Sequence, residues 1–506
     1  MNIEAIIPIV VQFLQILIIT YFFVYNSFNF FLLIVAFVSI KLHLRKLIVL
    51  DPDIIYDIPD LPPVSLVVPA YNEGKIIVRC VESLLKMHFP KFEIIVVNDG
   101  STDNTLEKLI KAFHFEGREI KYEDVLKTGK ITDVYAAPIQ DSRIIDLVLI
   151  DKENGGKSDA LNAGINAATC SYVCTMDSDS IMEPNALLYA MQPLLENREE
   201  VAAVGGQVGV SNGFKIKDGK LIKSEVSRKW IVINQLVEYL RTFTMGRTAL
   251  SSLNSLLVLS GVFSIFRKDL LLKIGGYLSH HTQSKVALEY CGKRTTVCED
   301  MEVIVRLIRY IYENDLNMKI KYSPVPIAWT EVPEHYSDLA KQRNRWYRGL
   351  LEVLYMHREM FLNPTHKQMG FLAMPLQVIF EAFGPFLELI GYLFIPIAWL
   401  TGRLQIEYLI LFMTVSVLYG SFLSIMAVLL GVSSEQEYRN PSSQVSIFQY
   451  TSVWDIMKLL IAGITSNVWF RQITLLFSVS GLWSLIRGKK HWGDIKRRGF
   501  EGQENE

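Results

Sequence analysis

The chain has 506 residues, of which 50% are hydrophobic, and its 51 Lys and Arg nearly balance its 52 Asp and Glu. A net charge of −1 offers no excess of positive charge for holding nucleic acid, so we expect no nucleic-acid partner. The apolar fraction exceeds what a soluble enzyme needs, and the surplus gathers in the first 44 residues and after about residue 369. We therefore expect a globular domain between membrane segments.

Residues 5–25 form an uncharged apolar run of about 20 residues, the length that a helix needs to cross roughly 30 Å of hydrocarbon. A second run, 28–44, follows the polar pair Asn26-Ser27, so the sequence predicts two transmembrane helices within residues 1–46. The positive-inside rule places the basic end of the second run in the cytoplasm. Its basic residues are Lys41, His43, Arg45 and Lys46. The N-terminus and the globular domain are then both predicted to be cytoplasmic, in a protein integral to the cell membrane.

The C-terminal part, 369–487, is predicted to contain transmembrane and interfacial helices. Its first stretch, 369–400, is interrupted by three prolines and is predicted to be an interfacial piece followed by one span. The run 405–431 is typical of a span. The run 455–487 suits either an interfacial helix or a hairpin, which leaves four or six crossings. The basic tail, 488–506, is predicted to be cytoplasmic.

Residues 60–335 alternate apolar runs that suit buried strands with stretches of helical spacing, a pattern that predicts an α/β domain with a mostly parallel, Rossmann-like sheet. The predicted strands are 65–69, 92–97, 147–150 and 172–176. Ligands of such sheets bind at the carboxyl ends of the strands. Polar residues follow three of these ends, namely Asp99, Lys157 and the pair Asp177 and Asp179. We expect these side chains to share one rim.

Asp177 and Asp179 flank one residue in an extended segment, so both side chains can project to the same side. Carboxylate oxygens together with a diphosphate suit Mg²⁺ or Mn²⁺, because such ions keep few protein ligands and take phosphate oxygens. A solvated turn is the alternative interpretation of this motif. Asp99 has a similar alternative, because its Asn-Asp-Gly-Ser context forms turns by itself.

Lys157 lies in the tripeptide Gly156-Lys157-Ser158, which is similar to the end of a phosphate-binding P-loop. That loop requires a glycine where Asp151 stands, so an ATPase is not expected. Lys157 is instead expected to contact a phosphate or to hold an acidic site together by its point charge.

Glu299 and Asp300 precede a run of helical apolar spacing. Acidic residues stabilise a helix N-terminus electrostatically, and a carboxylate at this place could equally be a general base. The spacing leaves both interpretations open.

Residues 336–368 are predicted to form an interfacial amphipathic helix that contains the motif QRNRW at 342–346. Arg345 could clamp a diphosphate, and Trp346 could pack on a sugar ring. The alternative is an interfacial helix with basic and aromatic anchors.

Seven segments, in this order, are similar to those of the processive family-2 glycosyltransferases, which include poly-N-acetylglucosamine, hyaluronan and cellulose synthases. They are VSLVVPAYNE (64–73), VVNDGSTDNT (96–105), GGKSDALNAG (155–164), TMDSDS (175–180), SGVFSIFRKD (260–269), CEDMEV (298–303) and QRNRW (342–346). The chain resembles the poly-N-acetylglucosamine synthases most, through two leading spans and the ending HWGDIKRRGF (491–500). The resemblance implies a GT-A fold for the cytoplasmic domain.

The resemblance also implies a role for each matching residue. The uridine diphosphate of the donor would contact Ala70, Tyr71, Glu73, Asp99, Lys157, Asp177, Gln342 and Arg345. The metal, Mg²⁺ or Mn²⁺, would bind Asp179 directly, together with Asp177. The acceptor would lie against Ser260, Gly261, Glu299 and Trp346. Asp300 matches the general base.

By the same resemblance, the chain is expected to be an inverting hexosyltransferase that uses a UDP-sugar, UDP-GlcNAc first, to extend a β-linked extracellular polysaccharide and translocate it. Its partners would be the donor, the growing polymer, the lipid bilayer and accessory membrane or export subunits. The alternative enzyme transfers a single sugar to a polyprenyl phosphate or another lipid. A transporter is the alternative from another class, although four to six spans without an internal repeat are few for one. Residues 114–146 and 278–297 have no assigned role.

Glu381 and Glu388 lie in an apolar stretch, seven residues apart, and would share one helical face if Pro385 does not break the helix. Carboxylates are costly in lipid, so they should face the bundle interior, a watery path or the interface. One hypothesis places this segment beside the polymer path. The other has Pro385 end an interfacial helix, so that Glu381 contacts headgroups or the cytoplasmic domain.

Overall fold

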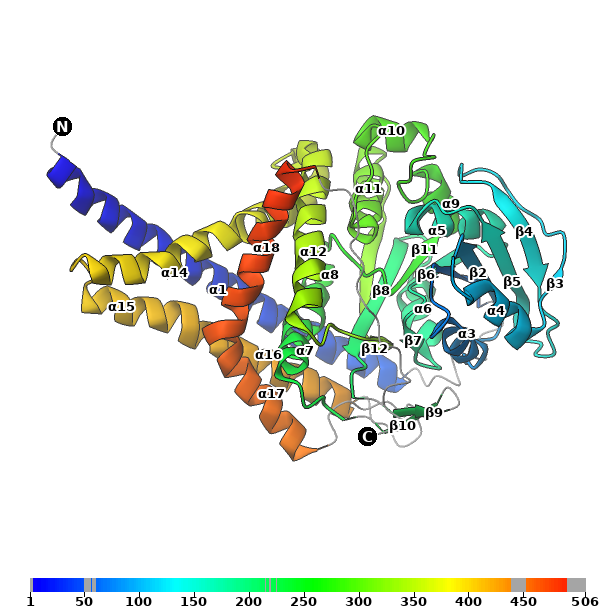
Figure 1. The fold of residues 1–506 in the computed structure, drawn as a ribbon, viewed down its shortest axis with the longest axis horizontal. Helices are drawn as coiled ribbons and strands as arrows, with labels where there is room; N and C mark the ends of the chain where they lie inside the picture. Colours follow the sequence, from blue (N-terminus) through cyan, green and yellow to red (C-terminus); the bar gives the residue numbers. More distant parts are fainter. Residues whose placement is uncertain are drawn as a thin grey trace.

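The structure, a computed structural model, describes residues 3–49, 56, 61–213, 215–217, 220–223, 225–437 and 452–488. An α/β domain built on a large sheet lies beside a group of long apolar helices (Figure 1). The first helix of the chain and its last helices form that group, and the sheet comes from the middle of the chain. The predicted class, an α/β domain inserted between apolar helices, is confirmed. The predicted tail beyond Gly488, with the ending 491–500, lies outside the described residues.

The sheet has ten strands in the order β3-β4-β5-β2-β1-β6-β11-β8-β12-β7. Four neighbouring strands are parallel to one another and match those that the sequence predicts: β1 (Val64–Ala70), β2 (Phe92–Asp99), β5 (Ile144–Lys152) and β6 (Tyr172–Met176). The other strands join mainly by antiparallel pairing, so the sheet as a whole is mixed. They are β3 (Glu116–Gly117), β4 (Ile131–Ala136), β7 (Ile181–Met182), β8 (Val201–Val210), β11 (Phe263–Arg267) and β12 (Lys319–Thr330).

Successive residues of the parallel strands pack into two different cores, because side chains alternate across a strand. On β2, Ile95 and Val97 belong to one core, and Ile94 and Val96 belong to the other. With both faces covered, the strands are continuously apolar in sequence. The helices of the first core include α5 (Lys157–Ala167) and α11 (Glu299–Glu313), and those of the second are α3 (Ile77–Leu85), α4 (Thr105–Phe113) and α6 (Ala186–Glu196).

The two segments without an assigned role both extend the domain. Residues 114–146 supply the antiparallel edge strands β3 and β4, which continue the sheet beyond β5. Residues 278–297 contain helix α10 (Lys285–Cys291), whose Ala287 and Cys291 pack with Met356.

Helix α1 runs without interruption from Ile3 to Val49, which is about 70 Å at 1.5 Å per residue. The prediction of two separate helices within 1–46 is therefore wrong. Neither Asn26 nor Ser27 forbids helical geometry, and Asn26 Nδ2 donates to Val415 O (2.7 Å) inside the helical bundle instead of ending a helix.

By length and composition, four helical segments among the described residues could cross a membrane: Ile7–His43, Met369–Leu400, Ile406–Ser434 and Val453–Ile486. The last has the length of one span, where the sequence predicted an interfacial helix or a hairpin. The polar residues of Val453–Ile486 do not require an interfacial helix or a hairpin, because they have partners within the bundle. Arg471 pairs with Glu388, and Asn467 Nδ2 donates to Ser424 Oγ. The number of candidate spans among the described residues, four, is even. One of them precedes the α/β domain, and three follow it.

The stretch 369–400 is one candidate span by length and composition, and its first part packs on the α/β domain through Met369, Ala373 and Ala382. It begins with the π-helical turns η4 (Met369–Ala373) and η5 (Gln377–Ala382), and α14 (Gly384–Leu400) follows. Pro385 stands in the first turn of α14, where its missing N–H has no helical partner to lose. The proline therefore begins a helix at this point instead of ending one.

Helix α12 (Tyr336–Met356) connects the domain to the bundle by packing along α18 (Arg471–Ile486). Asn344 Nδ2 donates to Ser480 Oγ (2.9 Å) and to Ser484 Oγ (3.0 Å). At Gly481, a Cβ would lie 2.8 Å from Asn344 O, so only glycine allows this approach. The motif 342–346 is thus fixed against α18.

Candidate active site

The parallel strands bring their carboxyl ends to one edge of the domain. In the strand register, Ala70 at the end of β1 pairs with Asn98, and Asp99 at the end of β2 pairs with Lys152 at the end of β5. Strand β6 ends at Met176, directly before Asp177. The rim that the sequence predicts is therefore assembled by parallel pairing.

Lys157 is the centre of an acidic cluster at this edge. Its Nζ lies 2.6 Å from Asp177 Oδ1 and 2.8 Å from Glu299 Oε1. Burial alone would lower the pKa of Lys157, but these two carboxylates outweigh burial and raise it. The side chain is 21% exposed, and its ammonium is paired with both carboxylates. Helix α5, strand β6 and helix α11 each deliver one member of the cluster.

Asp300 and Gly261 complete this cluster. Gly261 N donates to Asp300 Oδ2 (3.2 Å), and Met301 N donates to Asp300 Oδ1 (2.9 Å). A Cβ on Gly261 would lie 3.0 Å from Lys157 Nζ, 3.5 Å from Asp177 Oδ2 and 3.8 Å from Asp300 Oδ2. Gly261 therefore stands where the charged side chains converge, and any side chain there would crowd them.

Ser260, the neighbour of Gly261, uses its polar groups within the turn. Its Oγ accepts from Val262 N (3.2 Å), and its carbonyl accepts from Ser264 Oγ (2.8 Å). The structure thus places Ser260 in support of Gly261, ahead of strand β11.

The turns after β1 and β2 are tied together by Asn72. Asn72 Oδ1 accepts from Thr102 N (2.8 Å) and Asp103 N (3.2 Å), and Asn72 N donates to Ser101 Oγ (3.0 Å). Asn72 has a positive φ of 56°, which asparagine tolerates better than most residues. The adjoining Tyr71 is 49% exposed and faces solvent from this turn.

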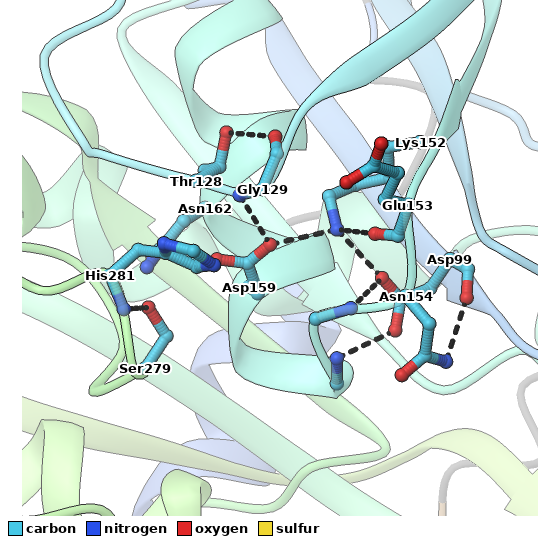
Figure 2. Close-up of polar contacts among 12 residues, drawn as sticks. Asp99, Thr128, Gly129, Lys152, Glu153, Asn154, Asp159, Asn162, Ser279 and His281 are labelled. Carbon is cyan, nitrogen blue, oxygen red and sulfur yellow. Dashed lines mark hydrogen bonds and ion pairs between the residues drawn. The ribbon is translucent and has the colours of Figure 1, made fainter.

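Asp99 is almost entirely buried and already accepts three hydrogen bonds (Figure 2). Lys152 Nζ (2.8 Å) and Gly155 N (3.0 Å) donate to Oδ1, and Gly156 N (2.8 Å) donates to Oδ2. The sequence pattern points to Asp99 but not to Lys152 or to Asp159, the second acidic partner of Lys152. Both residues could have been found in the sequence, because Lys152 ends an apolar strand and Asp159 lies in the first turn of the next helix.

The residues proposed for a divalent metal fit one chemically. Burial raises the pKa of the Cys80 thiol, and the charges of Asp179, Glu73 and Asp177 raise it further. All three carboxylates therefore lie within electrostatic reach of one buried sulfur. Carboxylate oxygens are ligands that suit a hard divalent cation.

The motif on α12 lies beside the start of α11. Burial raises the pKa of Cys298, and the charges of Asp300, Arg345 and Glu299 also act on this thiol. Cys298 Sγ donates to Trp346 O (3.9 Å). Arg345 and Trp346 are thus near the acidic cluster.

Two further features of the motif differ from its sequence interpretation. Arg343 was not selected, yet its guanidinium pairs with both oxygens of Glu238 (2.6 and 2.8 Å) and lies 4.5 Å from the centre of the Trp346 ring. Gln342 Oε1 is a buried acceptor with no donor among the described residues.

A second buried polar cluster lies on the same helix as Asp300. Arg306 Nε and Nη2 donate to the two oxygens of Glu302 (2.7 and 2.8 Å), while Cys291 Sγ (3.3 Å) and His357 Nε2 (3.4 Å) approach Oε1. Ligand atoms of Cys291, Glu302 and His357 all lie within 4.8 Å of one another. Because Arg306 covers both carboxylate oxygens, this cluster is a charge-balanced anchor for α11.

Two family models match the chain. The model described as glycosyl transferase family 2 matches residues 65–124, and the model described as glycosyltransferase like family 2 matches residues 127–349. Among curated proteins, poly-beta-1,6-N-acetyl-D-glucosamine synthase of Staphylococcus epidermidis is 28% identical over 291 residues, which is 58% of this chain and 55% of that protein. The same synthase of Staphylococcus aureus (strain COL) is 27% identical over 304 residues, 60% of this chain and 58% of that protein. The match therefore spans a little more than half the length of these relatives.

Two solved structures are similar at lower identity. The mannosyltransferase PcManGT from Pyrobaculum calidifontis, in complex with GDP-Man and Mn²⁺, is 17% identical with a TM-score of 0.44, covering 88% of this chain and 99% of that one. S. aureus TarS 1–349 in complex with UDP-GlcNAc is 13% identical with a TM-score of 0.35, covering 86% of this chain and 94% of that one.

Proposed function

We propose, from the premise that residues 65–349 carry family-2 glycosyltransferase domains, that the chain is a membrane hexosyltransferase which extends a β-linked polysaccharide from a UDP-sugar. The observation that carries the proposal is the convergence of Lys157, Asp177, Glu299 and Asp300 on Gly261. This arrangement joins a cation and a fixed carboxylate base in one site, as transfer from a nucleotide sugar requires. The names of the curated relatives support a polymer product, with UDP-GlcNAc as the first donor to test.

In the proposed reaction, Asp300 accepts the proton of an acceptor hydroxyl, whose oxygen bonds to the anomeric carbon from the face opposite the diphosphate. The bond from that carbon to the diphosphate oxygen breaks, which inverts the anomeric configuration and releases UDP. Both Asp300 oxygens accept a backbone N–H, so the carboxylate is held in one orientation with lone pairs left for the hydroxyl. Lys157 and Arg345 offset the charge that grows on the departing diphosphate.

Asp179 and Asp177 would hold Mg²⁺ or Mn²⁺ in this proposal. The ion, when bound, supplies a Lewis acid for the phosphate oxygens. The chain's own contribution is to place Asp177 and Asp179 directly after the carboxyl end of strand β6.

Replacing Asp179 by alanine is expected to weaken metal-dependent donor binding, because a hard oxygen ligand is removed. UDP binding to purified protein, titrated with Mg²⁺ and Mn²⁺, measures the effect. Asp124→Ala, a change in an exposed loop acid, serves as the control. A donor affinity and a metal response equal to those of the wild type would contradict the metal assignment.

We place the α/β domain in the cytoplasm, at the inner face of the cell membrane. Support comes from the basic cluster at the domain end of α1, where Lys41, Arg45 and Lys46 follow the apolar run. A single crossing by α1 then puts the N-terminus outside.

We further propose that the polymer leaves along the bundle near Glu381. The two acids of this stretch have different surroundings: Glu388 is buried and pairs with Arg471 (Nε–Oε2 2.8 Å) and with Tyr21 OH (3.2 Å), whereas Glu381 is exposed on η5. The π-helical segment η5 ends at Ala382 and α14 begins at Gly384, between the two acids. Glu388 is thus a structural partner, and Glu381 is the acid that a polymer could contact.

Replacing Glu381 by leucine is expected to shorten the polymer while UDP release with short acceptors continues, because the change affects the exit path and not the acidic cluster. Product sizing beside a UDP-release assay measures both. Glu407→Leu, at an exposed acid in another apolar helix, is the matched control. Polymer of normal length from the Glu381 variant would contradict this path.

A further inference from the structure

One uninterrupted helix of the α/β domain, residues 230–252, lies between the sheet and the apolar bundle (Figure 1). We call it the junction helix. It consists of α7 (Trp230–Tyr239), the π-helical segment η1 (Leu240–Arg247) and α8 (Thr248–Ser252). Met245 and Ala249 pack in one core with apolar residues of α1 and of α16 (Tyr419–Glu437). The junction helix is therefore held by the bundle, although it belongs to the domain.

Arg247, the last residue of the π-helical segment, connects the junction helix to the chain ahead of β11. Arg247 Nη1 donates to Leu259 O. Its Cζ lies 3.8 Å from the centre of the Phe243 ring, which holds the guanidinium by a cation–π contact. The Leu259 side chain is fully buried, and a Cβ on Gly205 of β8 would lie 2.8 Å from Leu259 Cδ2. Leu259 is thus held by the sheet on one side and by Arg247 on the other.

Leu259 lies two residues before Gly261, whose N–H holds the carboxylate of Asp300. Gly261 N donates to Asp300 Oδ2 (3.2 Å), and the intervening Ser260 uses its own polar groups to shape the turn. A shift of the Leu259 carbonyl therefore moves the Gly261 N–H relative to Asp300. Proton transfer needs the base within hydrogen-bond reach of the acceptor hydroxyl, and a misplacement of about 1 Å can cost about 10²-fold in rate.

We propose that Arg247 is a positioning residue for the general base, because it ties the turn 259–261 to the junction helix and so holds the Asp300 carboxylate in the orientation that transfer requires. The inference rests on the proposed function, in which Asp300 takes the proton of the acceptor hydroxyl. Arg247 contacts neither donor nor acceptor and acts only through Asp300. Because the junction helix packs on α1 and α16, the same contact links the bundle to the reacting group.

Replacing Arg247 by methionine removes the donor to Leu259 O. The kcat for sugar transfer is expected to fall by about tenfold to 10²-fold, as for a displaced catalytic group. The affinity for UDP and the KM for the UDP-sugar should stay close to those of the wild type. Arg247→Lys keeps the charge but not the planar guanidinium, so it should recover part of the rate. Arg228→Met, at an exposed arginine just before the junction helix, is the matched control.

The same change made in the Asp300→Asn background separates positioning from a general structural role. A residue that acts only through the base has little left to affect once the base is absent. Arg247→Met should therefore lower the residual rate of the Asp300 variant by less than about twofold, because the two changes are coupled and not additive. Equal fold-losses in the two backgrounds overturn the inference.

Thermal unfolding shows whether the methionine variant is folded, and the lysine variant, measured in both backgrounds, provides a second test. A folded methionine variant that transfers sugar at the wild-type rate overturns the inference. So does a loss of UDP affinity as large as the loss of rate. A wild type that releases no UDP from any UDP-sugar contradicts the proposed function itself, and this inference with it.

Discussion

Replacing Asp300 by asparagine is expected to lower the rate of sugar transfer by about 10²- to 10⁴-fold, the usual contribution of a general base. The amide keeps the shape of the carboxylate and can still accept the Gly261 N–H, but it cannot take the proton of the acceptor hydroxyl. UDP binding should remain close to that of the wild type. Transfer rates and UDP affinities of purified wild type and variant separate the two effects.

Asp315→Asn is the matched control for this change, because Asp315 is an exposed aspartate in the loop that follows the same helix. Its φ of 50° suits asparagine equally well, so the fold should not be disturbed. Transfer by the Asp300 variant within about tenfold of the wild type would remove Asp300 from the role of base, since it falls below the range for such a group.

Replacing Arg306 by methionine is expected to destabilise the domain by about 3–5 kcal/mol, because it leaves the buried Glu302 carboxylate without its cation. The change also removes donors from Ile274 O and Gly276 O. Thermal unfolding of the purified protein measures the loss. Arg267→Met breaks a more exposed ion pair with Asp269 and should change stability by less than about 1 kcal/mol.

The double variant Glu302→Gln with Arg306→Met should recover part of this loss, because no unpaired charge is then buried. Burial alone would raise the pKa of Glu302, but Arg306 and His357 lower it to about 2. A carboxylate with a lowered folded pKa stabilises the fold above its unfolded value near 4.5, and this contribution is lost as the pH falls from about 4.5 toward 2. An Arg306 variant that melts like the wild type would contradict the role of this anchor.

The centre of the domain was predictable from sequence because its strands are short, apolar and followed by turn residues. Strands β1, β2, β5 and β6 were predicted for this reason, and with them the rim that carries Asp99 and Asp177. The pairing of β8, β11 and β12 was not predictable in the same way, since these strands meet across long stretches of chain.

The errors in the membrane part have a common physical cause. In the sequence, Asn26 interrupts an apolar run and suggests the end of a helix, but its amide donates to Val415 O, 389 residues away. Arg471 is likewise paired with Glu388, 83 residues away. A local pattern does not reveal that a distant helix satisfies a polar group. The same holds for Lys152, whose partners Asp99 and Asp159 come from a neighbouring strand and the following helix.

The most direct test of the account is the product that purified full-length protein makes from labelled UDP-GlcNAc in the presence of Mg²⁺ or Mn²⁺. The account predicts release of UDP together with labelled β-linked chains of many sugars, and loss of both in the Asp300→Asn variant. The contrary result would be no UDP release from UDP-GlcNAc, UDP-glucose or UDP-glucuronate, or a product that carries one sugar on a lipid and never grows.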